Sequence, residues 1–468
     1  MATRRALMAG TAAIAGLSVA GAAGYRIWRD REPSAPPAAD SGGHMLWRNW
    51  SGIQWAYPAR RSAPANEDEL ATLLKSAPGP IRPVGAGHSF MPLVPTAGTL
   101  LSLDRMAGVV DHDSAALTAK VRAGTRLGDL GPALAAIGQE MWNLPDINKQ
   151  SLGGALGTGT HGTGKGLKAI HGEALSFRIA TAGGEVLDCA PDRQPEIYNA
   201  ARVGLGAFGV ITEVTLQNRP LTPRIYKRVE LRDWHEVAED WPNLQATHRN
   251  AEFYVIPFTG KAAVITADPT ARPLLPRGED RDSATLMQLK SLRDVLGLAP
   301  PVRRWVADKL MTGMAPEESV DQGWKLLSSE RPIRFNEMEF HLAREAQIPA
   351  LKEVMATVEA KRNDVFFPIE VRTIEADDAW LSPFYQRPSG SVAVHAYYKD
   401  DYQFLFELIE PIFRRHGGRP HWGKLNSLKA ADFRTLYPRW QDAMTVRAHL
   451  DPTGRFLNRY LKKALIDD

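Results

Sequence analysis

From Trp47 onward, short apolar runs alternate with polar or glycine-rich turns along the chain. Apolar residues that alternate or cluster predict strands at 81–84, 100–103, 109–111, 117–121, 175–181, 185–187 and 210–216. Apolar residues spaced three or four apart predict one helix after the N-cap residue Asn66 and another at 127–137. The order of these elements is mixed and shows no regular strand–helix–strand series, so an α+β domain is predicted for residues 47–219.

The second part of the chain, residues 220–468, contains fewer glycines. Its alternating patterns predict strands at 335–341, 366–373 and 391–398, and its helical patterns predict helices at 348–362 and 403–415. These elements indicate an antiparallel sheet with helices on one face, in a separate domain. The more basic, helical segment 270–316 predicts a surface excursion and nothing more specific.

The first 46 residues differ from the rest of the chain. Arg4 and Arg5 precede a weakly apolar, uncharged run from Met8 to Gly24, which predicts a twin-arginine (Tat) export signal at residues 1–24 and an exported, periplasmic location. An uncleaved membrane anchor is the alternative, because residues 7–25 are just long enough to cross a bilayer. Residues 25–46 are rich in Pro, Ala, Ser and Gly and predict a flexible linker.

Composition and charge exclude several classes of protein. The chain is 44% hydrophobic and 24% charged, which is typical of a globular protein and excludes extensive disorder. The net charge of +4 is small for 468 residues, and no basic–aromatic motif is present, so no nucleic-acid partner is expected. The single cysteine, Cys189, excludes an intramolecular disulfide and a cysteine-based metal site. No metal is expected at His161 and His171 either, because no third ligand has a suitable spacing.

The densest glycine segment runs from Ser151 to Gly166, where seven of sixteen residues are glycine. Such a backbone carries few side chains and can approach phosphates or a flat ring closely. The segment is not a Walker loop, because Lys165 is not followed by Ser or Thr, and its glycine spacing does not match a dinucleotide-binding fingerprint.

Six segments in a fixed order carry a family resemblance. They are PVGAGHSF at 83–90, SLGGALGTGTHGTG at 151–164, GLGAFGVITEVTL at 204–216, EVRT at 370–373, HWGK at 421–424 and LDPTGRFLN at 450–458. Together they resemble the vanillyl-alcohol-oxidase-type (PCMH-type) flavoproteins, and most of all the branch of D-arabinono-1,4-lactone, L-gulonolactone and alditol oxidases. The resemblance implies an α+β fold with a two-subdomain FAD-binding domain at 47–219, followed by a cap domain whose antiparallel sheet is flanked by helices.

The resemblance also implies which residues bind FAD. His88 matches the position where many of these oxidases attach the flavin covalently, and an imidazole nitrogen is a suitable nucleophile; the alternative is a histidine that only hydrogen-bonds its loop. For His161, a packed loop histidine is as plausible as a contact to flavin. The other implied cofactor residues are Gly85, Ala86, Gly87 and Ser89 in the first turn, Ser151, Gly154, Gly157, Thr158, Gly159 and Gly162 in the glycine-rich segment, and Ile211.

Substrate chemistry is expected from the cap. Glu370 and Arg372 lie two apart on a predicted strand, so their side chains leave the same face, either as a simple ion pair or as a device that orients a polyol. The family places Lys424 beside them, where it and Arg372 would stabilise a developing oxygen anion. His395 is a further candidate base, with a hydrogen-bonded sheet histidine as the alternative.

The expected activity is oxidation of the carbinol of an aldono-1,4-lactone or an alditol by hydride transfer to flavin N5. Oxygen is the expected acceptor and hydrogen peroxide the product; a dehydrogenase that uses a quinone or cytochrome is the alternative, and a flavin-binding protein without turnover is a third reading. One departure from the family bears on the substrate. Lactone-oxidising members commonly carry a second histidine two residues after the HWGK motif, whereas Leu425 and Asn426 follow it here.

Overall fold

The computed structural model describes residues 30–278 and 282–467. The export signal or anchor predicted at residues 1–24 lies outside the described residues. Among the residues that are described, no helix is both long and apolar enough to span a membrane. The described part of the predicted linker is fixed to the surface, because Tyr57 donates to the Pro37 carbonyl at 2.7 Å and Glu32 pairs with Lys399 at 2.9 Å. These contacts tie part of the segment predicted as a linker, residues 25–46, to both domains.

The first domain contains two main sheets. Strands β3, β5 and β4 pair in parallel, and the larger sheet has the order β10-β9-β11-β7-β6, with β8 pairing along the end of β11. Helix α2 begins where the Asn66 side chain accepts the Glu69 N–H at 2.9 Å. The elements are β1 (Trp47–Arg48), β2 (Trp55–Ala56), β3 (Arg60–Ser62), α2 (Glu67–Ser76), β4 (Ile81–Val84), β5 (Thr99–Ser102), β6 (Val109–Asp113), β7 (Thr118–Arg122), α3 (Leu127–Ala136), β8 (Gln139–Met141), α4 (Leu152–Thr158), the 3-10 helix η1 (Ile170–Glu173), β9 (Ala174–Ala180), β10 (Val186–Cys189), α5 (Pro195–Ala201) and β11 (Val210–Pro220).

The second domain is built on one eight-stranded antiparallel sheet with the order β15-β12-β14-β13-β17-β18-β16-β19. Its elements are β12 (Ile225–Asp233), α6 (Trp234–Thr247), β13 (Asn250–Ile256), β14 (Lys261–Pro269), α7 (Asp282–Leu296), α8 (Pro300–Met311), β15 (Glu317–Asp321), α9 (Gly323–Leu326), β16 (Phe335–Ala343), α10 (Arg344–Lys361), β17 (Ile369–Ile374), β18 (Ser389–Tyr397), the π-helical turn η2 (Leu405–Ile409), α11 (Glu410–Arg415) and β19 (Arg419–Pro420).

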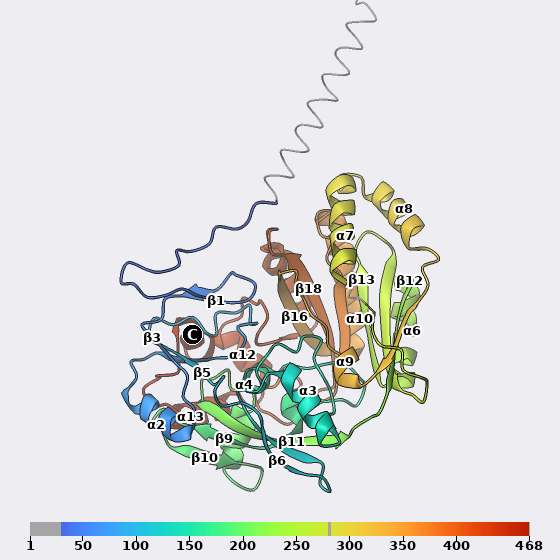
Figure 1. The fold of residues 1–468 in the computed structure, drawn as a ribbon. Helices are drawn as coiled ribbons and strands as arrows, with labels where there is room; N and C mark the ends of the chain where they lie inside the picture. The colour runs from blue at the N-terminus through green and yellow to red at the C-terminus, as the bar shows by residue number, and fades with distance from the viewer. Residues whose placement is uncertain (1–29, 279–281, 468) are drawn as a thin grey trace, which may run out of the picture.

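The two faces of this sheet have different roles. Helices α6 and α10 cover one face (Figure 1), and α11 packs beside α10. On this face Phe253 packs on Trp241 and Phe340 packs on Phe413. Side chains alternate along a strand, so the residues next to these phenylalanines point to the other face. That second face carries Tyr254 and other polar residues of the central strands and lines a large cavity. The predicted antiparallel sheet with helices on one face is thus confirmed.

The C-terminal helices α12 (Ala430–Leu436), α13 (Trp440–Leu450) and α14 (Arg459–Leu465) do not all belong to the cap. The Ile81 N–H donates to the Arg455 carbonyl at 2.7 Å, and Phe456 packs in the same core as Leu70 and Leu74. The end of the predicted cap segment, 220–468, thus packs against the first domain and joins the two.

Candidate active site

One cavity lies between the two domains and collects residues that are far apart in the sequence. The first domain contributes the turn after β4, the start of α4 and part of β11, and the cap contributes the polar face of its sheet. Predicted site residues that line this cavity are Gly85, Ala86, Gly87, His88, Ser89, Ser151, Gly154, Gly157, Thr158, His161, Ile211, Glu370, Arg372, His395 and Lys424. The structure thus brings fifteen of the seventeen predicted site residues to one place.

Gly159 and Gly162 are the two predicted residues that do not line the cavity. Gly159 ends α4 in the left-handed conformation with φ 74°, and a Cβ at Gly162 would lie 2.1 Å from the Leu144 carbonyl oxygen. Both glycines are required by the local backbone geometry. Part of the glycine-rich segment is helical, because the Ser151 side chain caps α4.

The turn after β4 brings the backbone close to the start of α4. A Cβ on Gly85 would lie 2.2 Å from the Ser151 Oγ, so any side chain here would displace one of the two segments. Gly87 has φ +69°, a conformation that other residues rarely adopt. The two glycines allow a narrow, nearly side-chain-free wall on this side of the cavity.

His88 leaves this wall and stacks on Trp50, with ring centroids 5.0 Å apart. Burial lowers the pKa of its imidazole to about 4, and the positive charges of Lys424 and Arg126 act in the same direction. The ring is therefore neutral at physiological pH, which leaves a nitrogen lone pair available as a nucleophile or hydrogen-bond acceptor.

Glu370 and Arg372 project from β17 into the cavity, as their spacing predicted. Arg372 Nε lies 3.2 Å from Glu370 Oε1, and the Tyr254 hydroxyl donates to the same oxygen at 2.7 Å. Burial, together with nearby carboxylates, raises the pKa of the Tyr254 phenol well above its ordinary value, so Tyr254 remains a donor. This carboxylate is held in one orientation and can still accept a hydrogen bond from a ligand.

Lys424 and His395 converge on Glu337, a residue of β16 that sequence reasoning missed. The Lys424 ammonium pairs with Glu337 Oε2, and His395 Nε2 lies 3.7 Å from Glu337 Oε1. The His395 Nδ1 donates to the Pro368 carbonyl at 2.9 Å, so in the neutral ring Nε2 is the nitrogen that can accept a proton. Position and tautomer fit His395 to a base near the cavity.

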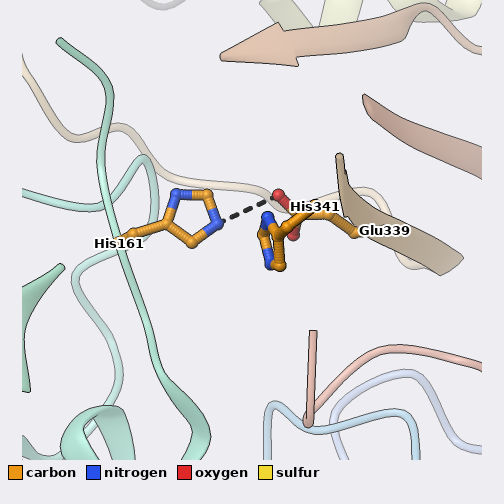
Figure 2. Close-up of side chains that lie close together, drawn as sticks. All are labelled: His161, Glu339 and His341. Carbon is orange, nitrogen blue, oxygen red and sulfur yellow. Dashed lines mark ion pairs between the residues drawn. The ribbon is translucent and has the colours of Figure 1, made fainter. Parts of the chain in front are cut away.

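Glu339, also missed, lies at the centre of a buried ionic network. Its Oε1 is 3.1 Å from His161 Nε2 (Figure 2). The same oxygen is 2.8 Å from Arg372 Nη2 and accepts a hydrogen bond from Ser391. Burial alone would raise the pKa of the Glu339 carboxyl, but Arg372 and His161 hold it well below the usual range. In return, Glu370 and Glu339 overcome the effect of burial and raise the pKa of Arg372 well above its ordinary value.

The signal for these missed residues was visible in the strand. Glu337, Glu339 and His341 alternate with Met338 and Phe340 along β16, and all five are buried. Acidic residues almost never become buried without a partner. An alternation of acidic and apolar residues in a strand with no exposed face therefore indicates a polar site and not a solvent-facing edge.

His161, Glu339 and His341 also have ligand atoms within 4.8 Å of one another, as two histidines and a carboxylate would need to hold a divalent metal (Figure 2). The charge around them opposes that reading. Glu339 Oε1 already faces the Arg372 guanidinium, and a metal cation bound there would be repelled by it. The cluster fits an ion-pair network that fixes Arg372 better than it fits a metal centre.

Sequence comparisons match two separate parts of the chain to two families. Residues 58–190 match the family described as FAD binding domain, and residues 214–464 match the family described as D-arabinono-1,4-lactone oxidase. The L-gulono-1,4-lactone dehydrogenase of Mycobacterium tuberculosis is 35% identical over 432 residues, which cover 90% of this chain and 99% of that protein. The chain belongs to the D-arabinono-1,4-lactone oxidase family.

Other relatives of this lactone oxidase family member carry related names. The L-gulonolactone oxidase of Bos taurus is 30% identical, covering 90% of this chain and 98% of the relative, and the alditol oxidase of a Streptomyces species is 28% identical, covering 89% and 98%. Among solved structures, a solvent-stable cholesterol oxidase has a TM-score of 0.73 at 19% identity, covering 90% of this chain and 97% of that one. At this identity the likeness shows the fold, and it confirms the predicted α+β architecture.

The cavity of this family member also fits FAD. The glycine wall at 85–87 offers main chain at close range, His88 presents a neutral imidazole, and Lys424 and Arg372 supply positive charge on the opposite, cap side. FAD combines a flat ring, which needs close walls, with oxygens and phosphates, which need donors and positive charge. Cavity and cofactor therefore match in shape and in charge.

Proposed function

We propose that this protein oxidises the carbinol of an aldono-1,4-lactone or an alditol with FAD as its cofactor. The observation that carries the proposal is the group formed by Glu370 and Arg372 on the cap sheet and Lys424 in the loop after β19, which lines one cavity with the glycine wall and His88. The names of the relatives agree with both substrate classes. When bound, FAD accepts the hydride that leaves the carbinol carbon.

The residues of the chain have distinct roles in this chemistry. Glu370 accepts a hydrogen bond from a substrate hydroxyl, since Tyr254 and Arg372 already fix its other contacts. His395 Nε2 is placed to take the hydroxyl proton as the carbonyl forms. Arg372 and Lys424 stabilise negative charge that develops on oxygen, and their partners Glu339 and Glu337 hold them in place.

An anaerobic screen tests this proposal directly. Purified yellow enzyme is mixed with a panel of aldono-1,4-lactones and alditols, and the loss of flavin absorbance is followed without oxygen. A compound of either class should bleach the flavin, and no bleaching with any of them would refute the proposal. The Lys424→Met variant is the matched control, because it should bind flavin yet fail to bleach, which also separates an enzyme from a flavin-binding protein without turnover.

For the cofactor linkage, we propose a covalent bond between His88 and FAD. The neutral imidazole and its position at the end of the glycine wall support it. Denatured wild-type enzyme should carry its yellow fluorescence into a denaturing gel, whereas His88→Ala should release all of its FAD on denaturation. Release of all FAD from the wild type would refute the bond.

For the second half-reaction and the location, we propose oxygen as an acceptor and export through the twin-arginine leader. Mixing the reduced enzyme with air in a stopped-flow instrument tests the proposed reaction with oxygen, since slow reoxidation would exclude an oxidase.

Cell fractionation of wild type and of an Arg4→Lys/Arg5→Lys variant tests the proposed export. The variant should stay in the cytoplasm if the two arginines direct export.

A further inference from the structure

Part of the cavity is not needed for a sugar-sized substrate. From the polar face at Glu370 it continues over β12, β13 and β14 and beneath helices α7 and α8. This continuation is called the helix-covered chamber. Leu286, Leu289, Leu292, Ala307 and Met311 form most of its helical wall, with Ser283, Thr285 and Gln288 as polar exceptions. A lactone or polyol has a hydroxyl on most carbons, and apolar walls leave such hydroxyls unpaired.

The chamber opens at an apolar mouth. Leu310 and Met314 both line the cavity, yet they are 67% and 57% exposed. Nearby, Leu298, Val302 and Trp305 are also exposed. Of the fifteen large apolar side chains exposed in the described part of the chain, nine lie between residues 274 and 314. Exposed apolar residues gathered in this way indicate a surface that meets another apolar phase or molecule.

The N-terminal end of the described chain lies beside the same helices. Asp30, the first described residue, pairs with Lys290 of α7 at 2.7 Å, so the described chain begins on the α7 side of the molecule (Figure 1). A leader held in a membrane would therefore bring α7 and α8 to the lipid surface. A tryptophan among exposed leucine and valine side chains is well suited to the boundary between lipid and water.

We propose that the helix-covered chamber binds an electron acceptor of the quinone class, which enters from a lipid surface through the mouth at Leu310 and Met314. The inference rests on the proposed function, because the electrons come from the flavin reduced there. A quinone gains two electrons and two protons to become a quinol, and the flavin returns to its oxidised form. Oxygen is small and needs no chamber, so this route is additional to reoxidation by oxygen.

Binding is tested first, without turnover. The oxidised full-length enzyme is photolabelled with an azido derivative of decylubiquinone, and the labelled peptides are identified by mass spectrometry. Label should appear between residues 282 and 315, and excess decylubiquinone should prevent it. Labelling that is spread over the surface or that is not displaced would overturn the proposal, whatever the outcome with lactones.

The mouth is tested next with a double variant, Leu310→Gln/Met314→Gln, whose exposed positions tolerate polar residues. The flavin is reduced with dithionite, so that the result does not depend on the identity of the substrate. The half-saturating concentration of decylubiquinone should rise roughly tenfold, because two apolar contacts are lost, while reoxidation by ferricyanide stays unchanged. Leu175→Gln, at an exposed leucine away from the cavity, is the matched control. Equal quinone kinetics in the double variant and in Leu175→Gln would refute the proposal that quinone enters at Leu310 and Met314.

The lipid route needs its own comparison. Val302→Gln/Trp305→Gln changes only the outer surface of α8, and neither residue lines the cavity. With decylubiquinone embedded in phosphatidylethanolamine–phosphatidylglycerol vesicles, this variant should be several-fold slower than wild type, whereas the two should be equal in detergent solution. Equal rates in vesicles would show that the quinone does not arrive from a lipid surface.

Discussion

Replacing Glu339 with glutamine removes one negative charge from the centre of the buried network and keeps the size of the side chain. In the wild type this carboxylate faces Arg372 at 2.8 Å and His161 at 3.1 Å, and all three side chains are buried. Breaking a buried ion pair by removing one partner costs about 3–5 kcal/mol. Because the amide oxygen of glutamine can still accept a hydrogen bond, we expect the free energy of unfolding to fall by about 3 kcal/mol.

Glu339→Gln should also lower activity, because it changes how the Arg372 guanidinium is held. With Glu339 neutral, the guanidinium has one charged partner left, Glu370, and is drawn toward the carboxylate that binds substrate. A misplaced charge of this kind lowers the rate about 10²-fold to 10³-fold, which corresponds to about 2.7–4 kcal/mol. We therefore expect kcat to fall about 10²-fold, with a smaller change in KM, since Glu339 acts on the orientation of Arg372 and not on substrate directly.

Steady-state kinetics on the best substrate of the anaerobic screen and urea denaturation measure both quantities. Glu353→Gln is the matched control, because Glu353 pairs with Arg415 on the exposed surface and does not line the cavity, and such surface pairs contribute at most about 1 kcal/mol. Glu339→Asp should recover part of kcat, since it restores the charge. Unchanged kcat and unchanged stability in Glu339→Gln would show that Arg372 is positioned without Glu339.

Four further outcomes are expected. Lys424→Met should keep its flavin and lose reduction by substrate by at least 10²-fold, measured by anaerobic stopped-flow absorbance. Attachment of FAD to apoenzyme should proceed at a constant rate between pH 5.5 and 8, because the pKa of His88 is about 4; a rate that rises through pH 6.5 would contradict its neutral state. Dialysis against EDTA should leave activity unchanged, whereas a loss restored by a divalent metal would assign a metal to His161, Glu339 and His341. Burial raises the pKa of Glu252 from 4.5 to about 7, so the folded state holds a proton that the unfolded state has lost and stability falls as pH rises from 4.5 to 7; Glu252→Gln should therefore raise the melting temperature at pH 8 and have little effect at pH 4.5.

The fold was predictable where local pattern and tertiary environment agree. Strand β4 has the bounds that its apolar run predicted, and α3 differs by a single residue at its end. The strand expected at 366–373 begins only at Ile369, because Pro368 has no N–H to donate to a neighbouring strand. The helix expected at 403–415 contains a π-helical turn from Leu405 to Ile409, which the spacing of apolar residues does not reveal.

Strands β12 and β14 were missed for a physical reason. In β12, every residue after Ile225 is half-buried, so the strand has no fully buried face. In β14, buried and half-buried residues alternate, but apolar residues stand on both faces, so the sequence shows no alternation of polar and apolar types. The segment after them, 270–316, was assigned to the surface, and the structure gives it a larger role. Helices α7 and α8 cover the chamber, and buried Arg293 and Arg303 tie them to the cap through the backbone carbonyls of Asp364 and Asn363.

In the candidate site, sequence motifs identify single positions but not the residues that pair with them. Glu370, Arg372 and Lys424 were recognised as single positions, but each depends on a partner that no motif contains. Lys424 pairs with Glu337 and Arg372 pairs with Glu339, and both glutamates lie on β16, outside the six segments that carry the family resemblance. Two cations next to a flavin site would repel each other if they were unpaired. The two buried glutamates on β16 supply the negative charge that keeps both cations in the site, so this strand sets the electrostatics on which the proposed oxidation depends.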